Sequence, residues 1–337
     1  MGFRKSSKAW LLAAAVAVAA ASPASAEVKI IMSNDNNAVG VKGRTFEVLK
    51  KELDARLKGK ATVELHHSGT LFDQKTQIQG LQLGSVHIIA PTQGIYAPLS
   101  AKINALSLPF LLTTPEAVEA AMADPLVKQS IVAELEKKNV TPIAIWINGP
   151  RDFSYRGSKP ILLPADIKGV KIRVQGVPVD IKTMQTFGAA PIAMSWSEAP
   201  TAMQQGVIDA VEVTPNALVG SGIYEMISQV TRVSYQYSFY IVGANKQWWD
   251  GLPADVKAAV QEAMKVATKW NWENTAKENE AAYDKVKALG KPIHDLTAAQ
   301  RAEWVKVSAP VWKEFGEKLV GVDVMHRLAE IGKEHSQ

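Results

Sequence analysis

The chain contains no cysteine among its 337 residues. That absence excludes disulfide bonds, zinc sites built on thiolates and catalysis by a cysteine nucleophile. It also excludes a lipid anchor carried on a processed N-terminal cysteine. The stability of the protein therefore has to come from its hydrophobic core, and a composition of 47% hydrophobic residues supplies enough material for one.

Recognisable catalytic motifs are missing as well. The six histidines include no pair with the spacing of a helical zinc site, and neither a phosphate-binding loop nor a nucleophile-elbow serine occurs. Gly220-Ser221-Gly222 is a fragment of a dinucleotide-binding fingerprint without its third glycine, so a turn is the simpler interpretation. We therefore expect no catalytic residue, no cofactor and no metal site within the protein itself.

Positive charge is in small excess, with 38 lysines and arginines against 33 aspartates and glutamates. Three of the basic residues, Arg4, Lys5 and Lys8, lie at the N-terminus before an apolar run and the small residues Ala24-Ser25-Ala26. This is the pattern of a secretory signal peptide, and the run of about 11 residues is too short for the roughly 20 of a membrane span. We expect residues 1–26 to be a signal peptide and the mature protein to be periplasmic.

The remainder of the chain is nearly neutral and shows no clustered Lys and Arg interleaved with aromatic residues, so we expect no nucleic-acid partner. A chain of this length typically folds into about two domains. Hydrophobic periodicity supports two similar α/β units, because an order of helix, glycine and buried strand occurs twice. The predicted strands are 28–32, 61–65, 86–90, 171–175, 191–193 and 207–211, with helices 41–57, up to 83, 198–205 and from Thr297, and glycine stops at Gly84 and Gly206.

A helical pattern over residues 252–289 is the longest in the sequence. Pro253 suits its first turn and Gly290 ends it. At about 1.5 Å per residue the helix would be roughly 55 Å long, which exceeds one lobe of a protein of this size. We therefore predict that it lies across both lobes.

The segment Lys171 to Gln175 (KIRVQ) alternates as a strand does. Ile172 and Val174 share one face, while Lys171, Arg173 and Gln175 share the other. From the pattern alone, a solvated face is the simpler interpretation of the polar side. The alternative is a ligand cleft, because ligands of open α/β sheets lie beyond the carboxyl ends of the strands. A planar guanidinium in that place would match a carboxylate bidentately.

These segments resemble the solute-binding subunits of tripartite ATP-independent periplasmic (TRAP) transporters, the DctP-type family. The resemblance rests on DIKGVKIRV at 166–174, GAAPIAMSWSEAPTAMQQGVIDAVE at 188–212, GTLFDQKTQIQGLQLGSVHIIAP at 69–91 and ALSLPFLL at 105–112, and it covers essentially the whole mature chain. It implies an α/β, two-lobed periplasmic binding protein fold with a long helix spanning both lobes. The expected division is 27–148 with 239–279 for lobe I, and 149–238 with 280–337 for lobe II.

The resemblance also implies a function, which is capture of an organic acid by lobe closure and delivery to the membrane permease subunits of an ion-driven transporter. A receptor for an ATP-driven importer and, less favoured, a periplasmic enzyme acting on organic acids are the alternatives. We expect a monomer, with a dimer through the long helix left open.

Ligand-binding residues follow from the resemblance position by position. Arg173 is implied as the salt-bridge partner of the substrate carboxylate and Arg151 as a second basic contact. Trp196 stands where an aromatic residue often packs on the ligand, although a core tryptophan is the simpler alternative. The remaining predicted contacts are Asn34, Asp73, Gln74, Thr92, Gln175, Glu212 and Thr214.

The sequence departs from the family pattern just after Glu212. Many relatives read Glu-Asn-Pro there, with the asparagine on the substrate, whereas Val213 and Thr214 occupy that place here and Asn216 is displaced. A C4-dicarboxylate, a hydroxy or keto acid and a sugar acid therefore all remain candidate ligands, as does a metal ion that bridges the ligand to Glu212.

Overall fold

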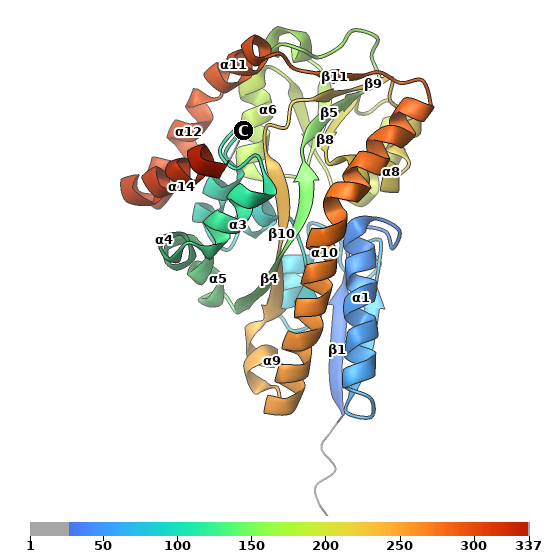
Figure 1. Ribbon diagram of the computed structural model, residues 1–337, viewed down its shortest axis with the longest axis vertical. Helices are drawn as coiled ribbons and strands as arrows, with labels where there is room; N and C mark the ends of the chain where they lie inside the picture. Colours follow the sequence, from blue (N-terminus) through green and yellow to red (C-terminus); the bar gives the residue numbers. More distant parts are fainter. Residues whose placement is uncertain (1–26, 336–337) are drawn as a thin grey trace, which may run out of the picture.

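The computed structural model describes residues 27–335. The predicted signal peptide, residues 1–26, lies outside the described residues. Within the described range, no helix combines the length and the apolar composition needed to cross a membrane. The chain builds two β-sheets with helices around them, and these sheets occupy opposite halves of the molecule (Figure 1).

The first sheet has five strands in the order β2-β1-β3-β10-β4. β1, β2 and β3 run parallel, and β10 pairs antiparallel with both β3 and β4. The predicted strands at 28–32 and 61–65 are confirmed, whereas the third is shorter than predicted. The bounds are β1 Val28–Ser33, β2 Ala61–His66, β3 Ile88–Ile89, β4 Val140–Pro150 and β10 Tyr237–Asn245.

The second sheet has six strands in the order β11-β9-β5-β8-β6-β7. β6 lies between β7 and β8 and runs parallel to both, so the strand that carries Arg173 is inside the sheet and not at its edge. Arg173 and Gln175 on its polar face are buried, with Gln74 and Trp196 against Arg173, whereas the Lys171 side chain on the same face is 44% exposed. The bounds are β5 Asp152–Tyr155, β6 Lys171–Val174, β7 Ala190–Ala193, β8 Ala210–Val213, β9 Gln229–Arg232 and β11 Ile293–Asp295.

The predicted repeat of helix, glycine and strand is present in both halves. Gly84 follows α2 (Gln77–Gln82) with φ of 73°, and Gly206 follows α7 (Ala199–Gln204) with φ of 72°. In each unit the next two amides donate to one carbonyl of the preceding helix, Gly80 O or Ala202 O. A left-handed glycine allows this tight helix ending because it has no Cβ to clash.

Two long strands connect the sheets. β4 leads through Gly149 and Pro150 directly into β5, and β10 returns along β4 from Tyr237 to Asn245. Gly149 has φ of 135°, and a Cβ there would collide with the side-chain amide of Asn279. A glycine is therefore required where the chain passes from one sheet to the other.

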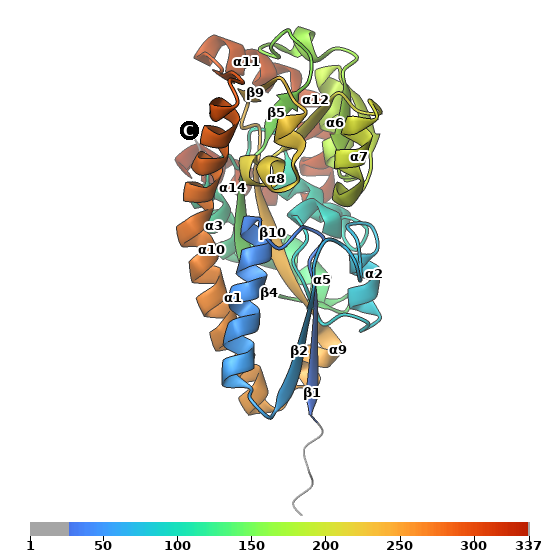
Figure 2. The same ribbon diagram turned by 90° about the vertical axis from the view of Figure 1, so that its right-hand side faces the viewer.

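The predicted long helix is a single helix, α10 (Ala254–Ala288), and it passes along both sheets beside α1 (Val41–Arg56), as Figures 1 and 2 show. On the first sheet, Asn271 accepts from Ile147 N at 2.7 Å and donates to Ile147 O at 3.2 Å. On the second sheet, the Tyr283 hydroxyl donates to the carboxylate of Asp152. Side chains of α10 thus form hydrogen bonds with the backbone of the first sheet and with a buried carboxylate of the second.

The other helices cover the faces and ends of the sheets. The C-terminal helices pack on helices of both halves of the molecule. α14 packs on α3 and α4, and α12 packs on α6. The α-helical bounds are α3 Pro115–Ala123, α4 Pro125–Val127, α5 Ala133–Glu136, α6 Pro178–Phe187, α8 Pro215–Gly220, α9 Lys246–Gly251, α11 Ala298–Val307, α12 Ala309–Phe315, α13 Glu317–Val320 and α14 Val322–His335. Short 3-10 turns occupy Gln93–Tyr96, Ala101–Ser107, Pro164–Ile167, Trp196–Glu198 and Ile223–Glu225, and a π turn occupies Lys128–Val132.

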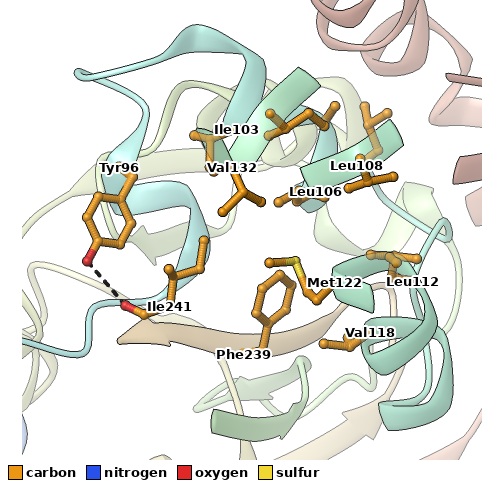
Figure 3. Close-up of a cluster of buried hydrophobic side chains, with 14 of the residues drawn as sticks. Tyr96, Ile103, Leu106, Leu108, Leu112, Val118, Met122, Val132, Phe239 and Ile241 are labelled. Carbon is orange, nitrogen blue, oxygen red and sulfur yellow. Dashed lines mark hydrogen bonds between the residues drawn. The ribbon is translucent and has the colours of Figure 1, made fainter. Parts of the chain in front are cut away.

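The largest apolar cluster packs under β10. Phe239 of β10 lies beside Met122 and Val118 of α3, whereas Ile241 lies nearer Tyr96, whose buried hydroxyl donates to Ile241 O at 3.2 Å (Figure 3). The cluster continues to α12 and α14. The Tyr96 hydroxyl within this core is thus hydrogen-bonded, as is usual for a buried polar group.

Replacing Asn271 by leucine should lower the free energy of unfolding by about 2–3 kcal/mol, because the buried Ile147 N–H loses its acceptor. Urea denaturation measures the change. Asn274→Leu is the matched control, since among residues 27–335 the Asn274 amide donates only to Trp270 O of its own helix and the loss should stay below about 1 kcal/mol. Equal losses in the two variants would contradict the role assigned to Asn271.

Asp152 should make stability depend on pH. Burial raises its pKa to about 6, although the Tyr283 and Ser234 hydrogen bonds oppose the shift. Between about pH 4 and pH 6 the unfolded carboxyl ionises while the folded one stays protonated, so stability falls as pH rises through this window. Relative to Asp152→Asn, the wild type should lose on the order of 2–3 kcal/mol across it. Tyr283→Phe removes a hydrogen bond to the carboxylate and should extend the fall to higher pH.

Candidate functional site

One cavity of ≈ 40 Å³ lies where the two sheets face each other. Its walls are polar, and its residues come from the loop after β1, α1, the turn before α2, the crossing strands β4 and β10, and the carboxyl ends of β6 and β8. The lining residues are Asp35, Asn36, Lys42, Gln74, Thr92, Asn148, Arg151, Arg173, Gln175, Trp196, Val213, Thr214, Ala217, Ser238 and Tyr240.

Arg173 projects from β6 into this cavity and is 2% exposed. Its Nε and Nη2 donate to Met194 O at 3.1 and 2.8 Å, and Nη2 also donates to Gln74 Oε1 at 2.6 Å. The guanidinium carbon lies 5.2 Å from the ring centre of Trp196. Burial lowers the pKa of Arg173 to about 10, so the side chain stays charged at neutral pH. Within residues 27–335, every hydrogen-bond acceptor of this cation is neutral.

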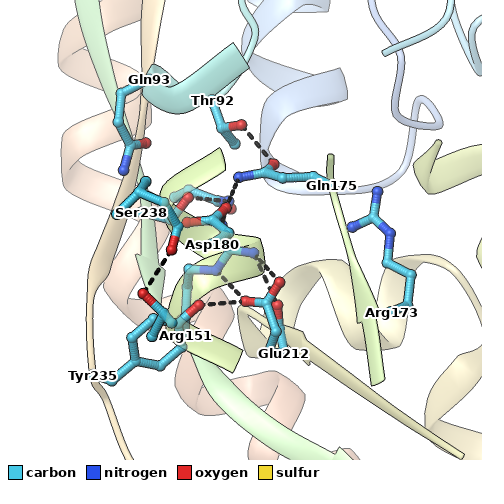
Figure 4. Close-up of polar contacts among 12 residues, drawn as sticks. Thr92, Gln93, Arg151, Arg173, Gln175, Asp180, Glu212, Tyr235 and Ser238 are labelled. Carbon is cyan, nitrogen blue, oxygen red and sulfur yellow. Dashed lines mark hydrogen bonds and ion pairs between the residues drawn. The ribbon is translucent and has the colours of Figure 1, made fainter. Parts of the chain in front are cut away.

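Arg151 behaves differently, because its charge is already compensated. Two of its nitrogens, Nε and Nη2, bind the two carboxylate oxygens of Glu212, and Asp180 lies 3.7 Å from a third (Figure 4). Tyr235 OH donates to the same Glu212 carboxylate at 2.6 Å. Burial acts to lower the pKa of Arg151, but the carboxylate of Glu212 outweighs it and the pKa is raised.

Lys42 is a third buried cation on the cavity wall, and the sequence analysis missed it. Its ammonium binds the carboxylate of Asp35 and lies 4.6 Å from the ring centre of Tyr240. Burial lowers the pKa of Lys42, whereas Asp35 opposes the shift. The residue is part of an amphipathic helix, so its sequence environment resembles that of a surface lysine.

Neutral groups form the rest of the wall. Gln175 Oε1 accepts from Thr92 Oγ1 at 2.7 Å and from Gln74 Nε2 at 3.3 Å, while its Nε2 donates to Asp180 at 2.7 Å. On the other side, Asn148 accepts from Thr214 Oγ1 at 3.0 Å. Amide and hydroxyl groups thus lie opposite the guanidinium of Arg173.

Asn216 lies later in the chain than the asparagine that follows the glutamate in the family pattern. Its side chain packs between structural elements. Its amide donates to Asn148 O at 2.8 Å and to Asn279 Oδ1 at 2.7 Å, which ties α8 to β4 and α10. The position near the cavity is held instead by Val213 and Thr214. The side chain of Asn216 therefore has a packing role between elements.

Contacts outside the cavity also join the two sides. Ser195 Oγ donates to Asp73 Oδ2 at 2.8 Å, and Lys75 pairs with Glu198 at 3.1 Å. The side-chain amide of Asn37 donates to Gly220 O. These contacts hold the loops of the first sheet against those of the second.

Seven of the ten predicted site residues line the cavity: Arg173, Arg151, Trp196, Gln74, Thr92, Thr214 and Gln175. Asn34, Asp73 and Glu212 are not among the lining residues. Asn34 folds back onto the amide of Asn36 and the ring of His67, and Asp73 caps the turn before α2. Direct contact of any of the ten with a ligand stays a prediction.

The carboxylate of Glu212 points to Arg151 and Tyr235, on the far side from Arg173 (Figure 4). Burial raises its pKa, and the Arg151 charge opposes the shift. Both carboxylate oxygens are therefore occupied by protein donors. Glu212 therefore orients Arg151. The two residues are 61 positions apart in the chain, so no local sequence pattern predicts this pairing.

Comparison with known proteins identifies close relatives. The family model for the bacterial extracellular solute-binding proteins, family 7, matches residues 32–319. The C4-dicarboxylate-binding periplasmic protein DctP of Rhodobacter capsulatus is 32% identical over 310 residues, which are 91% of this chain and 92% of that protein.

Two solved structures share the fold. A TRAP periplasmic solute-binding protein from Shewanella oneidensis with bound succinate is 26% identical, with a TM-score of 0.86, and the match covers 91% of this chain and 100% of that one. A TRAP periplasmic solute-binding protein from Ralstonia eutropha H16 with bound (S)-2-acetolactate is also 26% identical, with a TM-score of 0.82 and coverages of 92% and 99%.

Replacing Glu212 by glutamine should lower the free energy of unfolding by about 3–5 kcal/mol, because Arg151 loses its bidentate partner in a buried environment. Chemical denaturation at neutral pH measures the loss. Asp209→Asn is the control. The Asp209 carboxylate is 26% exposed and pairs loosely with Arg156 at 3.5 Å and Lys171 at 3.7 Å, so its loss should cost less than about 1 kcal/mol. A loss for Glu212→Gln no larger than that of the control would show that the pair does not stabilise the fold.

Proposed function

The chain belongs to family 7 of the bacterial extracellular solute-binding proteins, and we propose that it is the periplasmic receptor of a TRAP transporter for an organic acid. It captures the acid between two lobes and delivers it to an ion-driven membrane permease. Both solved relatives described above hold a carboxylic acid. The proposed role is binding without turnover, as the names of the relatives imply for those proteins.

The observation that carries the proposal is the state of Arg173. A buried cation with only neutral acceptors is costly unless something of opposite charge joins it. Among residues 27–335 nothing of that kind is hydrogen-bonded to Arg173, and its guanidinium lines the cavity. A ligand carboxylate supplies the missing charge, and it can replace Gln74 Oε1 as the acceptor for Nη2.

Lobe closure is the proposed mechanism of capture. The proposed lobes keep the predicted boundaries, 27–148 with 239–279 and 149–238 with 280–337, and the crossing strands with α10 act as the connection. Gln74 and Thr92 approach from lobe I, and Arg173 and Gln175 approach from lobe II. A ligand that contacts both sets binds the closed form more tightly and therefore shifts the population toward it.

Arg173→Ala should weaken binding of the cognate acid by at least about a hundredfold, because breaking a buried ion pair costs about 3–5 kcal/mol. Isothermal titration calorimetry measures the affinity after a thermal-shift screen has identified the acid. Lys171→Ala on the same strand is the matched control, since Lys171 bonds Gly206 O outside the cavity and its loss should leave affinity unchanged. Unchanged affinity in Arg173→Ala would refute the proposed site.

A further inference from the structure

The number of uncompensated charges in the cavity limits the number of carboxylates that a ligand can bring. Three buried cations line it, Lys42, Arg151 and Arg173. Lys42 is paired with Asp35, and Arg151 is paired with Glu212. In the described chain, Arg173 alone of these three lacks a carboxylate within salt-bridge distance.

From this charge balance we infer that the ligand is a monocarboxylate bearing an uncharged oxygen group, and not a C4-dicarboxylate; the inference rests on the proposed receptor function. One carboxylate pairs with Arg173. A second carboxylate would have to compete with Asp35 for Lys42 or with Glu212 for Arg151, and either exchange leaves a protein carboxylate buried without its partner.

A third acid strengthens the argument. Asp180 is 1% exposed, lies 3.7 Å from Arg151 and accepts from Gln175 at 2.7 Å, so it adds negative charge directly behind the cavity wall. Two buried carboxylates, Glu212 and Asp180, thus lie against Arg151, so this cation has no uncompensated charge for a second ligand carboxylate. A second ligand carboxylate would instead meet repulsion from the existing acids.

The groups opposite Arg173 suit hydroxyl or keto oxygens. Asn148 donates to Ser238 Oγ at 3.3 Å, and since the Ser238 hydroxyl donates to no group within residues 27–335, its proton can point at a ligand oxygen. Thr92 and Thr214 present further hydroxyls on the wall. Uncharged donors and acceptors of this kind fix the orientation of a ligand and give specificity.

The cavity also indicates a small ligand. The ≈ 40 Å³ of the cavity is the volume open to the centre of a water-sized sphere. A single water molecule needs at least about 10–15 Å³ of such volume, so the cavity has room for about three waters. An acid with about four carbons is therefore the best first probe, and acids that differ only in one end group separate charge from size.

Calorimetry on the purified protein with matched pairs of acids tests the inference. The pairs are 2-hydroxybutyrate with malate and butyrate with succinate. In each pair that binds, the monocarboxylate should bind at least tenfold more tightly. Tighter or equal binding of the dicarboxylate would overturn this inference and leave the receptor function intact, whereas no binding by any carboxylate would overturn both.

A substitution that removes one cavity carboxylate gives a second test. Asp35→Asn frees Lys42 and should reduce the preference for 2-hydroxybutyrate over malate at least tenfold, because a second cation becomes available. Asp209→Asn removes a carboxylate outside the cavity and should leave the ratio as in the wild type. An unchanged ratio in a folded Asp35→Asn protein, with folding checked by circular dichroism, would also overturn the inference.

Discussion

A cation enclosed in a protein interior needs a compensating charge, because removal from water penalises the ionised form and neutral hydrogen bonds recover only part of that loss. Arg173 is held in this condition by its own strand and by Met194 O, which accepts from two of its nitrogens. The neighbouring cations, Arg151 and Lys42, each have a carboxylate partner. The contrast among these three side chains, all within one cavity, is the basis for proposing that the site binds an anion.

The surrounding fold keeps this charge in place. β6 is held between β7 and β8, and Trp196 and Gln74 cover Arg173 on its polar face. On the opposite side, the repeated helix-glycine-strand unit brings Gln74 to Arg173. β4, β10 and α10 join the two sheets, and Gly149 permits the close contact with Asn279 where the chain crosses. In the proposed lobe closure, this connection rearranges and the two halves of the site come together while each sheet stays intact.

Local periodicity located α1, α2, α7, α10 and α11 and the strands of the repeated units, although β8 lies at Ala210–Val213 and not at 207–211. It did not locate β4 and β10. All nine residues of β10 are buried, so the alternation that marks a half-buried strand is absent there. The same limit applies to the site. Arg173 and Trp196 were found through sequence motifs, whereas Lys42 has the spacing of an ordinary helix residue and becomes a cavity residue only when Tyr240 of β10 packs beside it.

The family, the signal-peptide pattern, the repeated units and the strand that carries Arg173 were all determined by the sequence alone, because each depends on residues close together in the chain. The sequence could not decide which charges are free. Arg151 and Glu212 are 61 positions apart, and Gln74 reaches Arg173 across 99 positions. Pairings over such separations exist only after the sheets have assembled, since the distances between the charges, and hence their interaction energies, are set by tertiary packing.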